Sequence, residues 1–255
     1  MIDTHCHLND SQFDNDIDEV INRFFLSGGN AMICVGADLS SSLKAKMVAD
    51  LNDNIYYTIG IHPDDCDTFD LNEFEDLILT KSDKLVAIGE IGLDYYHNKT
   101  NKAKQIEVFS NQINLAIKYN LPIVIHCRDA YADLLEVLKK YSPLKIGAVM
   151  HCYSGSLEFA NELLKLGVKI SFTGTVTYKN AVKVKEVAKN IPLDSFFFET
   201  DAPYLAPEPN RGKRNEPKYV FDTAKYVADL RGIDAKELIR ITDANAKKFF
   251  NIDFI

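Results

Sequence analysis

Short apolar runs alternate with longer amphipathic segments along the whole chain. Eight apolar runs predict buried strands, at residues 2–7, 31–36, 55–60, 85–91, 122–126, 147–151, 168–172 and 195–200. Apolar residues at helical spacing predict helices over residues 16–27, 40–51, 71–79, 102–120, 130–141, 157–166, 180–190, 218–231 and 235–250. This regular alternation of strands and helices predicts an α/β fold.

The predicted strands differ from those of a half-exposed sheet. Their apolar residues run continuously instead of alternating with polar ones, which is typical of a parallel sheet covered on both faces. Eight strand–helix units in 255 residues match the size of a (β/α)₈ TIM barrel, about 250 residues. A doubly wound open sheet is the alternative. Because no linker, repeat or low-complexity tract divides the chain, we expect residues 1–255 to form one domain.

The histidines cluster at one predicted end of this barrel. Five of the six histidines end or directly follow a strand, namely His5, His7, His62, His126 and His151, whereas His97 falls in a loop. Glu90 ends the fourth strand and Asp201 the eighth. The carboxyl ends of barrel strands are where TIM-barrel enzymes carry their chemistry. We therefore expect an active site there.

The spacing of His5 and His7 indicates a metal site. Residues i and i+2 of a strand point to the same face, so both imidazoles would converge inside the barrel mouth. Imidazoles and carboxylates together suit divalent ions such as Zn²⁺ or Mn²⁺. A pair of buried structural histidines is the competing interpretation for this motif alone. The further ligand types at other strand ends favour the metal.

Neighbouring residues can be assigned by the same alternation. Asp3 shares a face with His5, and Glu199 shares one with Asp201, so both could orient metal-binding imidazoles; ordinary buried polar residues are the alternative. The cysteines next to proposed ligands should point outward under the helices, as small buried residues instead of ligands. They are Cys6, Cys127 and Cys152.

Several motifs resemble the TatD family of metal-dependent deoxyribonucleases, in the family order and over essentially the whole chain. They are DTHCHL from Asp3, GIHP from Gly60, GEIGLDYY from Gly89, PIVIHCRDA from Pro122, MHCYSGS from Met150, ETDAPYLAP from Glu199 and RGKRNEP from Arg211. One departure is Tyr153, where phenylalanine is common in the family. The set is specific, although DTHCH alone would indicate only the wider amidohydrolase superfamily.

The resemblance implies a TIM barrel with a two-metal centre. It assigns one ion to His5, His7, Glu90 and Asp201, and the other to Glu90, His126 and His151. Glu90 would bridge the ions, whose identity as Mg²⁺, Mn²⁺ or Zn²⁺ stays open. The implied activity is removal of nucleotides from DNA ends, mostly 3′ to 5′, with links to DNA repair.

The proposed chemistry is hydrolysis of a phosphodiester. Two divalent ions lower the pKa of a shared water and neutralise charge on the phosphoryl oxygens. Asp201 is the candidate that orients the water and accepts its proton, beside the bridging Glu90. Substrate contacts are expected from His62, Arg128, Arg211 and Lys213, with Arg214 as a further cation of the same loop. Solvated surface charge is the alternative for each of the cations. Tyr95, Tyr96, Tyr153 and Tyr204 could stack on bases, and core or hinge packing is the alternative for each of them.

The overall charge restricts how DNA could bind. The formal net charge is −8, which argues against binding through the field of the whole protein. Two divalent ions would leave the centre positive, so the attraction would be local. The sequence contains no zinc finger or basic tail, which predicts DNA binding without sequence specificity.

Composition adds expectations about context. The five cysteines form no CxxC pair, and the N-terminal residues lack the regions of a signal peptide, so a cytoplasmic protein is expected. No apolar run is long enough to span a membrane. We expect a monomer without an obligate partner. Two other functions stay open: an amidohydrolase of small amides or lactones, and an inactive metal-binding relative.

Overall fold

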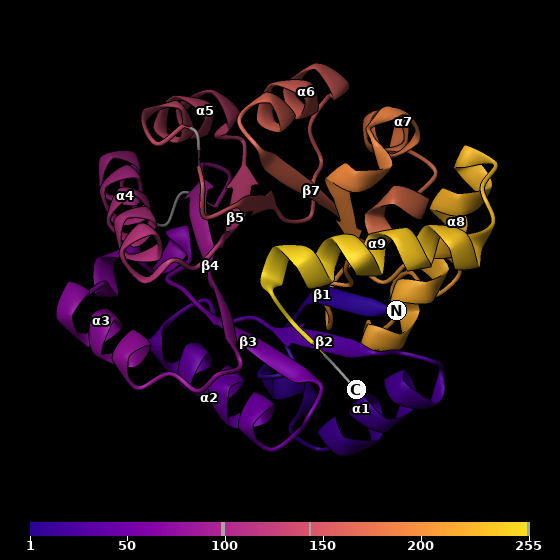
Figure 1. The fold of residues 1–255 in the computed structure, drawn as a ribbon, viewed down its shortest axis with the longest axis horizontal. Coiled ribbons are helices and arrows are strands. Elements are labelled where there is room, and N and C mark those ends of the chain that lie inside the picture. The colour runs from indigo at the N-terminus through magenta and orange to yellow at the C-terminus, as the bar shows by residue number, and fades with distance from the viewer. Residues whose placement is uncertain (98–99, 143, 254–255) are drawn as a thin grey trace.

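The computed structural model describes residues 1–97, 100–142 and 144–253. Eight parallel strands follow one another in chain order around a single sheet (Figure 1). They are β1 (Ile2–Cys6), β2 (Ala31–Cys34), β3 (Ile55–Ile59), β4 (Leu85–Asp94), β5 (Ile123–Arg128), β6 (Ala148–Met150), β7 (Val168–Phe172) and β8 (Phe196–Phe198). This arrangement confirms the (β/α)₈ TIM barrel and excludes the doubly wound sheet.

Helices surround the strands as an outer layer (Figure 1). They are α1 (Ile17–Leu26), α2 (Leu39–Asp50), α3 (Leu71–Leu79), α4 (Lys102–Tyr119), α5 (Tyr131–Lys140), α6 (Leu157–Lys165), α7 (Val182–Asn190), α8 (Val220–Arg231) and α9 (Ala235–Phe250). Within the described residues, none is long and apolar enough to cross a bilayer.

The backbone closes the barrel between its first and last strands. Just beyond the strand ends, the amide of Asp201 donates to the carbonyl of His5 at 2.9 Å, and the amide of His7 donates to Ala202 at 2.7 Å. These bonds bring together His5 and Asp201, the first and last of the metal ligands predicted from the sequence, which are 196 positions apart in the chain. The closure of the barrel therefore positions the site.

Apolar side chains fill the barrel from its amino-terminal end. Ile33, Val124 and Phe197 form an interior cluster with Phe250 of α9, which lies across that end of the barrel (Figure 1). A second, larger cluster packs the outer faces of the strands against the helices. Since side chains fill this end, the polar groups gather at the opposite one.

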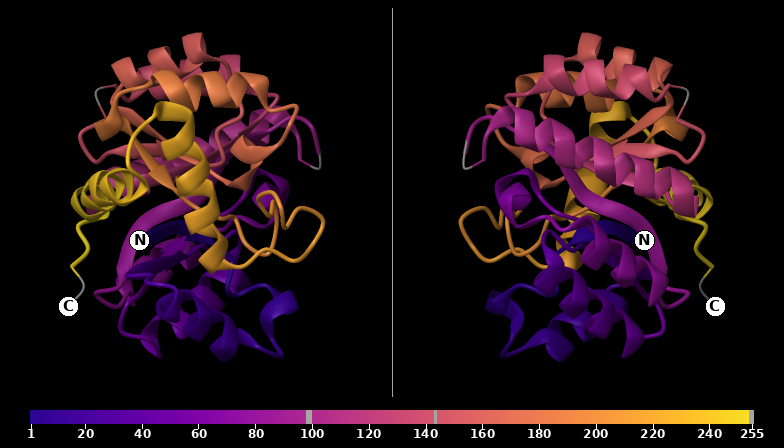
Figure 2. Two further views of the ribbon diagram at one scale, coloured as in Figure 1. Left: turned by 90° about the vertical axis from the view of Figure 1, so that its right-hand side faces the viewer. Right: turned by 90° about the vertical axis from the view of Figure 1, so that its left-hand side faces the viewer.

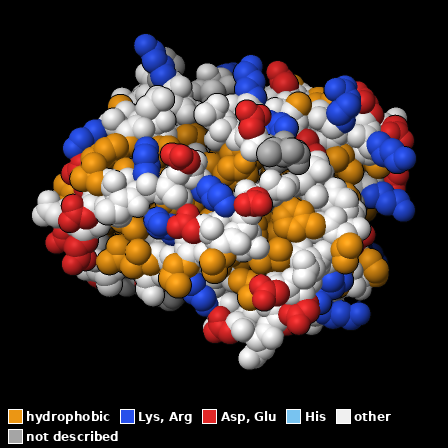
Figure 3. All heavy atoms as spheres, turned by 60° about the horizontal axis from the view of Figure 1, so that its bottom comes forward, with side chains coloured by type: hydrophobic (Ala, Val, Ile, Leu, Met, Phe, Trp, Pro, Cys, Tyr) orange, Lys and Arg blue, Asp and Glu red, His pale blue; other side chains and the backbone are white. Residues whose placement is uncertain are grey.

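The surface carries mixed charge. On the face shown in Figure 3, lysine and arginine side chains intermingle with aspartate and glutamate, and apolar side chains form separate small patches. The loop between β8 and α8 projects from the body of the barrel (Figure 2). It carries the RGKRNEP segment.

Candidate metal centre

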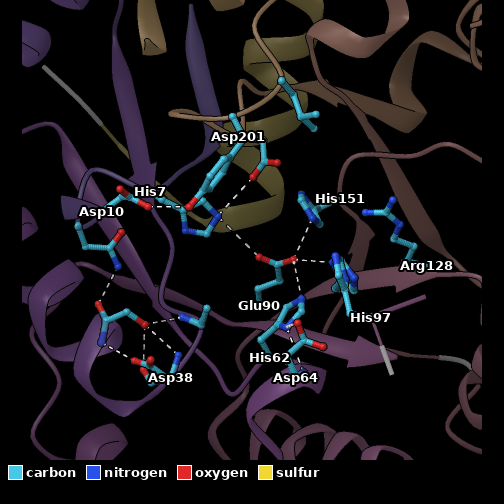
Figure 4. A pocket seen from close by; sticks show the side chains of 16 residues that line it. His7, Asp10, Asp38, His62, Asp64, Glu90, His97, Arg128, His151 and Asp201 are labelled. Carbon is cyan, nitrogen blue, oxygen red and sulfur yellow. Dashed lines mark hydrogen bonds and ion pairs between the residues drawn. The ribbon is translucent and has the colours of Figure 1, made fainter. Parts of the chain in front are cut away.

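The predicted metal ligands converge with His62 and Arg128 on one pocket at the carboxyl ends of the strands (Figure 4). The pocket has a volume of about 580 Å³. Its lining includes His7, His62, Glu90, His126, Arg128, His151 and Asp201, and His5 lies buried beneath it. The side chains come from β1, β4, β5 and the loops after β3, β6 and β8.

Glu90 stands between two groups of possible ligands. Its Oε2 lies 3.4 Å from Nε2 of His5 and 3.8 Å from Nε2 of His7. Its Oε1 lies 2.8 Å from Nδ1 of His126 and 2.9 Å from Nε2 of His151. The two oxygens of one carboxylate thus face two separate pairs of imidazoles.

Asp201 completes the first group. Its Oδ1 lies 3.3 Å from Nε2 of His7 and 3.6 Å from Nε2 of His5. These two ring nitrogens also lie only 3.2 Å apart. Two nitrogen lone pairs and two carboxylates directed at one point form a donor set that suits a divalent cation.

A glycine in the GIHP motif makes room for Glu90. A Cβ atom on Gly60 would stand 2.5 Å from the carbonyl carbon of Gly89 and 2.6 Å from the amide nitrogen of Glu90. Such distances are far below van der Waals contact, so a side chain at residue 60 would displace the backbone that carries Glu90. The motif thus fixes a backbone position as well as supplying His62.

Asp94 and His97 belong to the pocket region, although the sequence reasoning did not include them. Oδ2 of Asp94 lies 2.9 Å from Nε2 of His126 and 2.8 Å from Nδ1 of His97. His126 is therefore held between two carboxylates, with Nδ1 toward Glu90. His97 lies in the turn after β4, as expected, and from there it lines the same pocket as the other histidines.

The buried carboxylates behind the histidines act differently from one another. Glu199 lies 3.3 Å from Nδ1 of His151 and accepts hydrogen bonds from the amide of Cys152 and the hydroxyl of Ser171. Asp3 instead accepts from the backbone amides of His5 and Thr200 and from the Thr200 hydroxyl. Of the two interpretations of Asp3, these contacts favour the ordinary buried polar residue. Its carboxylate fixes the backbone that joins β1 to β8.

Three residues just beyond β5, β6 and β8 have left-handed backbone conformations. Asp129, Cys152 and Asp201 have φ values of 54°, 45° and 57°. Such values are uncommon for residues with a side chain, and they cluster at functional sites, where the surrounding structure enforces them. The amide of Asp201, the residue with this conformation after β8, donates a hydrogen bond to the carbonyl of His5 in β1.

Charges in the pocket favour a bound cation. Burial alone would raise the pKa of Glu90, but His151, His126 and His5 together hold it well below the usual range. Burial likewise opposes protonation of His151, yet Glu90 and Glu199 raise its pKa well above the usual value. The negative potential that favours a proton on these imidazoles also favours a divalent ion in its place. The residues therefore fit a metal.

Comparison with known proteins agrees with this geometry. Residues 2–251 match the family model described as TatD related DNase. The chain belongs to the TatD family. A relative from Bacillus subtilis, the "Uncharacterized metal-dependent hydrolase YabD", is 46% identical, over 99% of this chain and 100% of that protein.

Two further comparisons extend the family assignment. The "3'-5' ssDNA/RNA exonuclease TatD" of Citrobacter rodentium is 34% identical, over 99% of this chain and 98% of that protein. The crystal structure of the TatD homologue YJJV from Escherichia coli is 29% identical in sequence, with a TM-score of 0.94 over 99% of this chain and 98% of that one. This TatD-family chain is thus a metal-dependent hydrolase.

The cations expected to contact substrate divide into two places in the TatD-family chain. Arg128 lines the pocket, with its guanidinium 3.8 Å from the ring centre of Tyr96. Arg211 and Lys213 are exposed on the loop after β8 and are not among the residues that line the pocket. Arg214, the further cation of this loop, pairs instead with Asp16 at 2.6 Å.

The aromatic and sulfur side chains can be sorted in the same way. Tyr204 at the pocket and Tyr96 beside Arg128 are about half exposed, whereas Tyr153 is buried, which favours core packing for Tyr153 over stacking on bases. The five cysteines are free. The thiol of Cys6 donates a hydrogen bond to the carbonyl of Ile33, and the sulfur of Cys152 lies 3.4 Å from the hydroxyl of Thr173. None of the three neighbouring cysteines joins a possible metal cluster among the described residues.

Proposed function

We propose that this chain is a metal-dependent deoxyribonuclease that removes nucleotides from the 3′ end of single-stranded or frayed DNA. The observation that carries the proposal is the position of Glu90 between two sets of ligands, His5, His7 and Asp201 on one side and His126 and His151 on the other. The Citrobacter relative, which is named a 3'-5' ssDNA/RNA exonuclease, supports the substrate class.

The metal-binding roles follow the two groups. His5, His7 and Asp201 would hold one ion, His126 and His151 the other, and Glu90 would contact both. Divalent ions in such a site supply activation of water and neutralisation of charge on a phosphoryl oxygen. The histidines must be neutral to bind, which couples metal binding to the release of protons.

The other residues would position the reacting groups. Asp201 is held ionised, because His7, His151 and His5 lower its pKa against the effect of burial. Its carboxylate can therefore orient a water and accept its proton. Arg128 presents a guanidinium at the rim, which suits phosphate oxygens. Burial lowers the pKa of His62 to about 4, so its ring is a neutral hydrogen-bonding group beside Glu90.

End-labelled DNA tests the proposal directly. Purified protein is incubated with 3′-labelled or 5′-labelled single-stranded DNA in EDTA, Mg²⁺, Mn²⁺ or Zn²⁺, beside an Asp201→Asn variant. We expect metal-dependent release of mononucleotides from the 3′ label first, lost in EDTA and reduced at least about a hundredfold in the variant.

The controls separate an inactive protein from a different activity. Metal content and a melting curve for each sample show that the protein is loaded and folded. Intact DNA with every metal, from a loaded and folded protein, would overturn the nuclease assignment. Small amides and lactones in the same assay would then test an amidohydrolase.

A further inference from the structure

A side groove leads away from the metal centre toward β7. We define it by Ser154, Thr175, Tyr178, Val182, Lys183 and Arg211, which lie among the residues lining a hollow of about 510 Å³. It runs between the turn after β7, the start of α7 and the loop after β8.

The side groove is continuous with the metal centre. A connecting hollow of about 350 Å³ shares Arg128, His151 and Asp201 with the pocket of the centre. It shares Ser154 and Thr175 with the side groove. A chain molecule bound at the metal centre can therefore extend into the side groove without leaving the surface.

Charge distinguishes the side groove from the opposite wall of the pocket. The described residues lining the groove include Lys183 and Arg211 and no carboxylate. The pocket of the centre is lined on its other side by Asp10 and Asp38, which lie across Glu90 from Arg128 (Figure 4). The net charge of the chain is −8, so a bound polyanion is repelled by most of the surface. The side groove is the direction away from the metal centre in which the lining charges favour a polyanion.

The groove also offers faces on which bases can lie. The guanidinium of Arg211 stands 4.2 Å from the ring centre of Tyr178, whose hydroxyl donates to the carbonyl of Ala206 at 2.9 Å. Val182 exposes 71% of its surface beside them. Nη1 of Arg211 is 3.9 Å from Glu208, a distant and exposed pair that leaves most of its charge available.

We propose that the side groove binds the strand on the 5′ side of the scissile phosphate, so that the substrate is a single-stranded polynucleotide several nucleotides long. This rests on the proposed nuclease function. Lys183 and Arg211 contact successive phosphates, and Tyr178 with Val182 supports bases without reading their sequence. The terminal nucleotide occupies the other side of the centre.

Binding without cleavage provides the first test. In EDTA, the affinity of a fluorescein-labelled ten-nucleotide single strand is measured by anisotropy over a range of KCl concentrations. We expect the double variant Lys183→Gln/Arg211→Gln to bind on the order of tenfold more weakly, with a salt slope reduced by about 1.4, or about 0.7 for each lost phosphate contact. The matched control is Lys236→Gln/Arg240→Gln, which removes the same charges from α9 at the opposite end of the barrel.

Cleavage of substrates of different length provides the second test. The double variant should raise the KM of the ten-nucleotide strand by on the order of tenfold and leave that of a dinucleotide within about twofold. Equal effects on both lengths, or the same binding as the control variant, would overturn the side groove. If the wild type cleaves neither strand with any metal but the binding difference persists, the nuclease function fails and the groove stands.

Discussion

At the scale of single residues, Asp94 has the clearest testable role. Its carboxylate contacts Nε2 of His126 and Nδ1 of His97, so it determines which nitrogen of His126 faces Glu90. Carboxylates in this position keep a ligand imidazole in the correct tautomer, and their loss typically reduces metal affinity by about 10–100-fold. We expect such a loss for Asp94→Asn, measured by calorimetric titration with Mn²⁺ or Zn²⁺.

The control for Asp94→Asn is the same substitution at Asp133, an aspartate that lies away from the metal centre. Asp133 accepts a hydrogen bond from Tyr95 at 2.6 Å, and Asp133→Asn should leave metal affinity unchanged. A melting temperature of Asp94→Asn close to that of the wild type would show that the fold is intact. Unchanged metal affinity in a folded Asp94→Asn variant would mean that His126 does not need this partner.

Sequence reasoning missed Asp94 for an identifiable reason. The fourth strand was expected to end at Ile91, whereas β4 continues to Asp94 and pairs with β5 there, Gly92 opposite His126. Asp94 lies four positions after Glu90, so a longer strand would have placed both on one face. The role of Arg214 could not be predicted in this way, because its partner Asp16 lies 198 positions away in the chain.

At the scale of elements, the approach of β3 to β4 positions Glu90. A methyl group at residue 60 would overlap the backbone around Gly89 and Glu90, and overpacking of this kind costs about 1–3 kcal/mol. Gly60→Ala should therefore lower the free energy of unfolding by that amount and also reduce metal content and nuclease activity by at least about tenfold. Chemical denaturation and metal analysis on the same sample measure both effects.

A second glycine separates stability from positioning. Gly167 has a φ of +82° and open space around the position of a Cβ atom. Gly167→Ala should cost roughly 1–2 kcal/mol through backbone strain alone and leave metal content and activity unchanged. If both variants lose activity in proportion to their stability, then the close approach at Gly60 has no special effect on Glu90.

An ion-pair cluster fastens the loop after β8 to α1. Arg23 donates to both carboxylate oxygens of Glu216, at 2.9 and 3.0 Å. Burial would raise the pKa of Glu216, but Arg23 and Lys218 hold it below its usual value. A carboxyl whose pKa is lower in the folded than in the unfolded protein stabilises the fold above its unfolded pKa, and this stabilisation is lost as the pH falls through the folded pKa.

Replacement of Arg23 tests this cluster. We expect Arg23→Gln to lower the free energy of unfolding by about 1 kcal/mol at pH 7 and by progressively less below the ordinary glutamate pKa of about 4.3. Lys165→Gln, which removes an exposed pair with Glu162, should change stability little at any pH. A deficit of Arg23→Gln that persists unchanged at pH 3 would show that packing of the side chain, and not its charge, is responsible.

At the scale of the whole molecule, the barrel and its pocket could be predicted from the sequence, but the side groove could not. Eight apolar runs were enough for the barrel, since each strand is buried on both faces, and strand ends with His5, His126 and Asp201 were enough for the pocket. The side groove was not predictable, because Ser154, Val182 and Arg211 follow three different strands and meet only in the folded barrel. Charge contrast across a pocket is a property of the folded surface.

That contrast leads to a prediction about the DNA end. If the strand leaves through the side groove, its terminal nucleotide lies against the wall of the pocket that carries Asp10 and Asp38. Although partial burial opposes it, the hydrogen bond from Tyr204 lowers the pKa of Asp10, so this carboxylate is ionised. A phosphate on the 3′ oxygen would meet like charges there, and juxtaposition of this kind disfavours binding strongly.

We therefore expect a strand ending in a 3′-phosphate to have a KM at least about tenfold higher than the same strand ending in a 3′-hydroxyl. The difference should shrink as the salt concentration rises, because ions screen the exposed part of the repulsion. Asp10→Asn, which can keep the hydrogen bond to Tyr204, should also reduce the difference in KM between the two strands, whereas Asp133→Asn should not. Equal KM values for the two ends would place the terminal nucleotide away from the acidic wall and reverse the direction in which the strand crosses the centre.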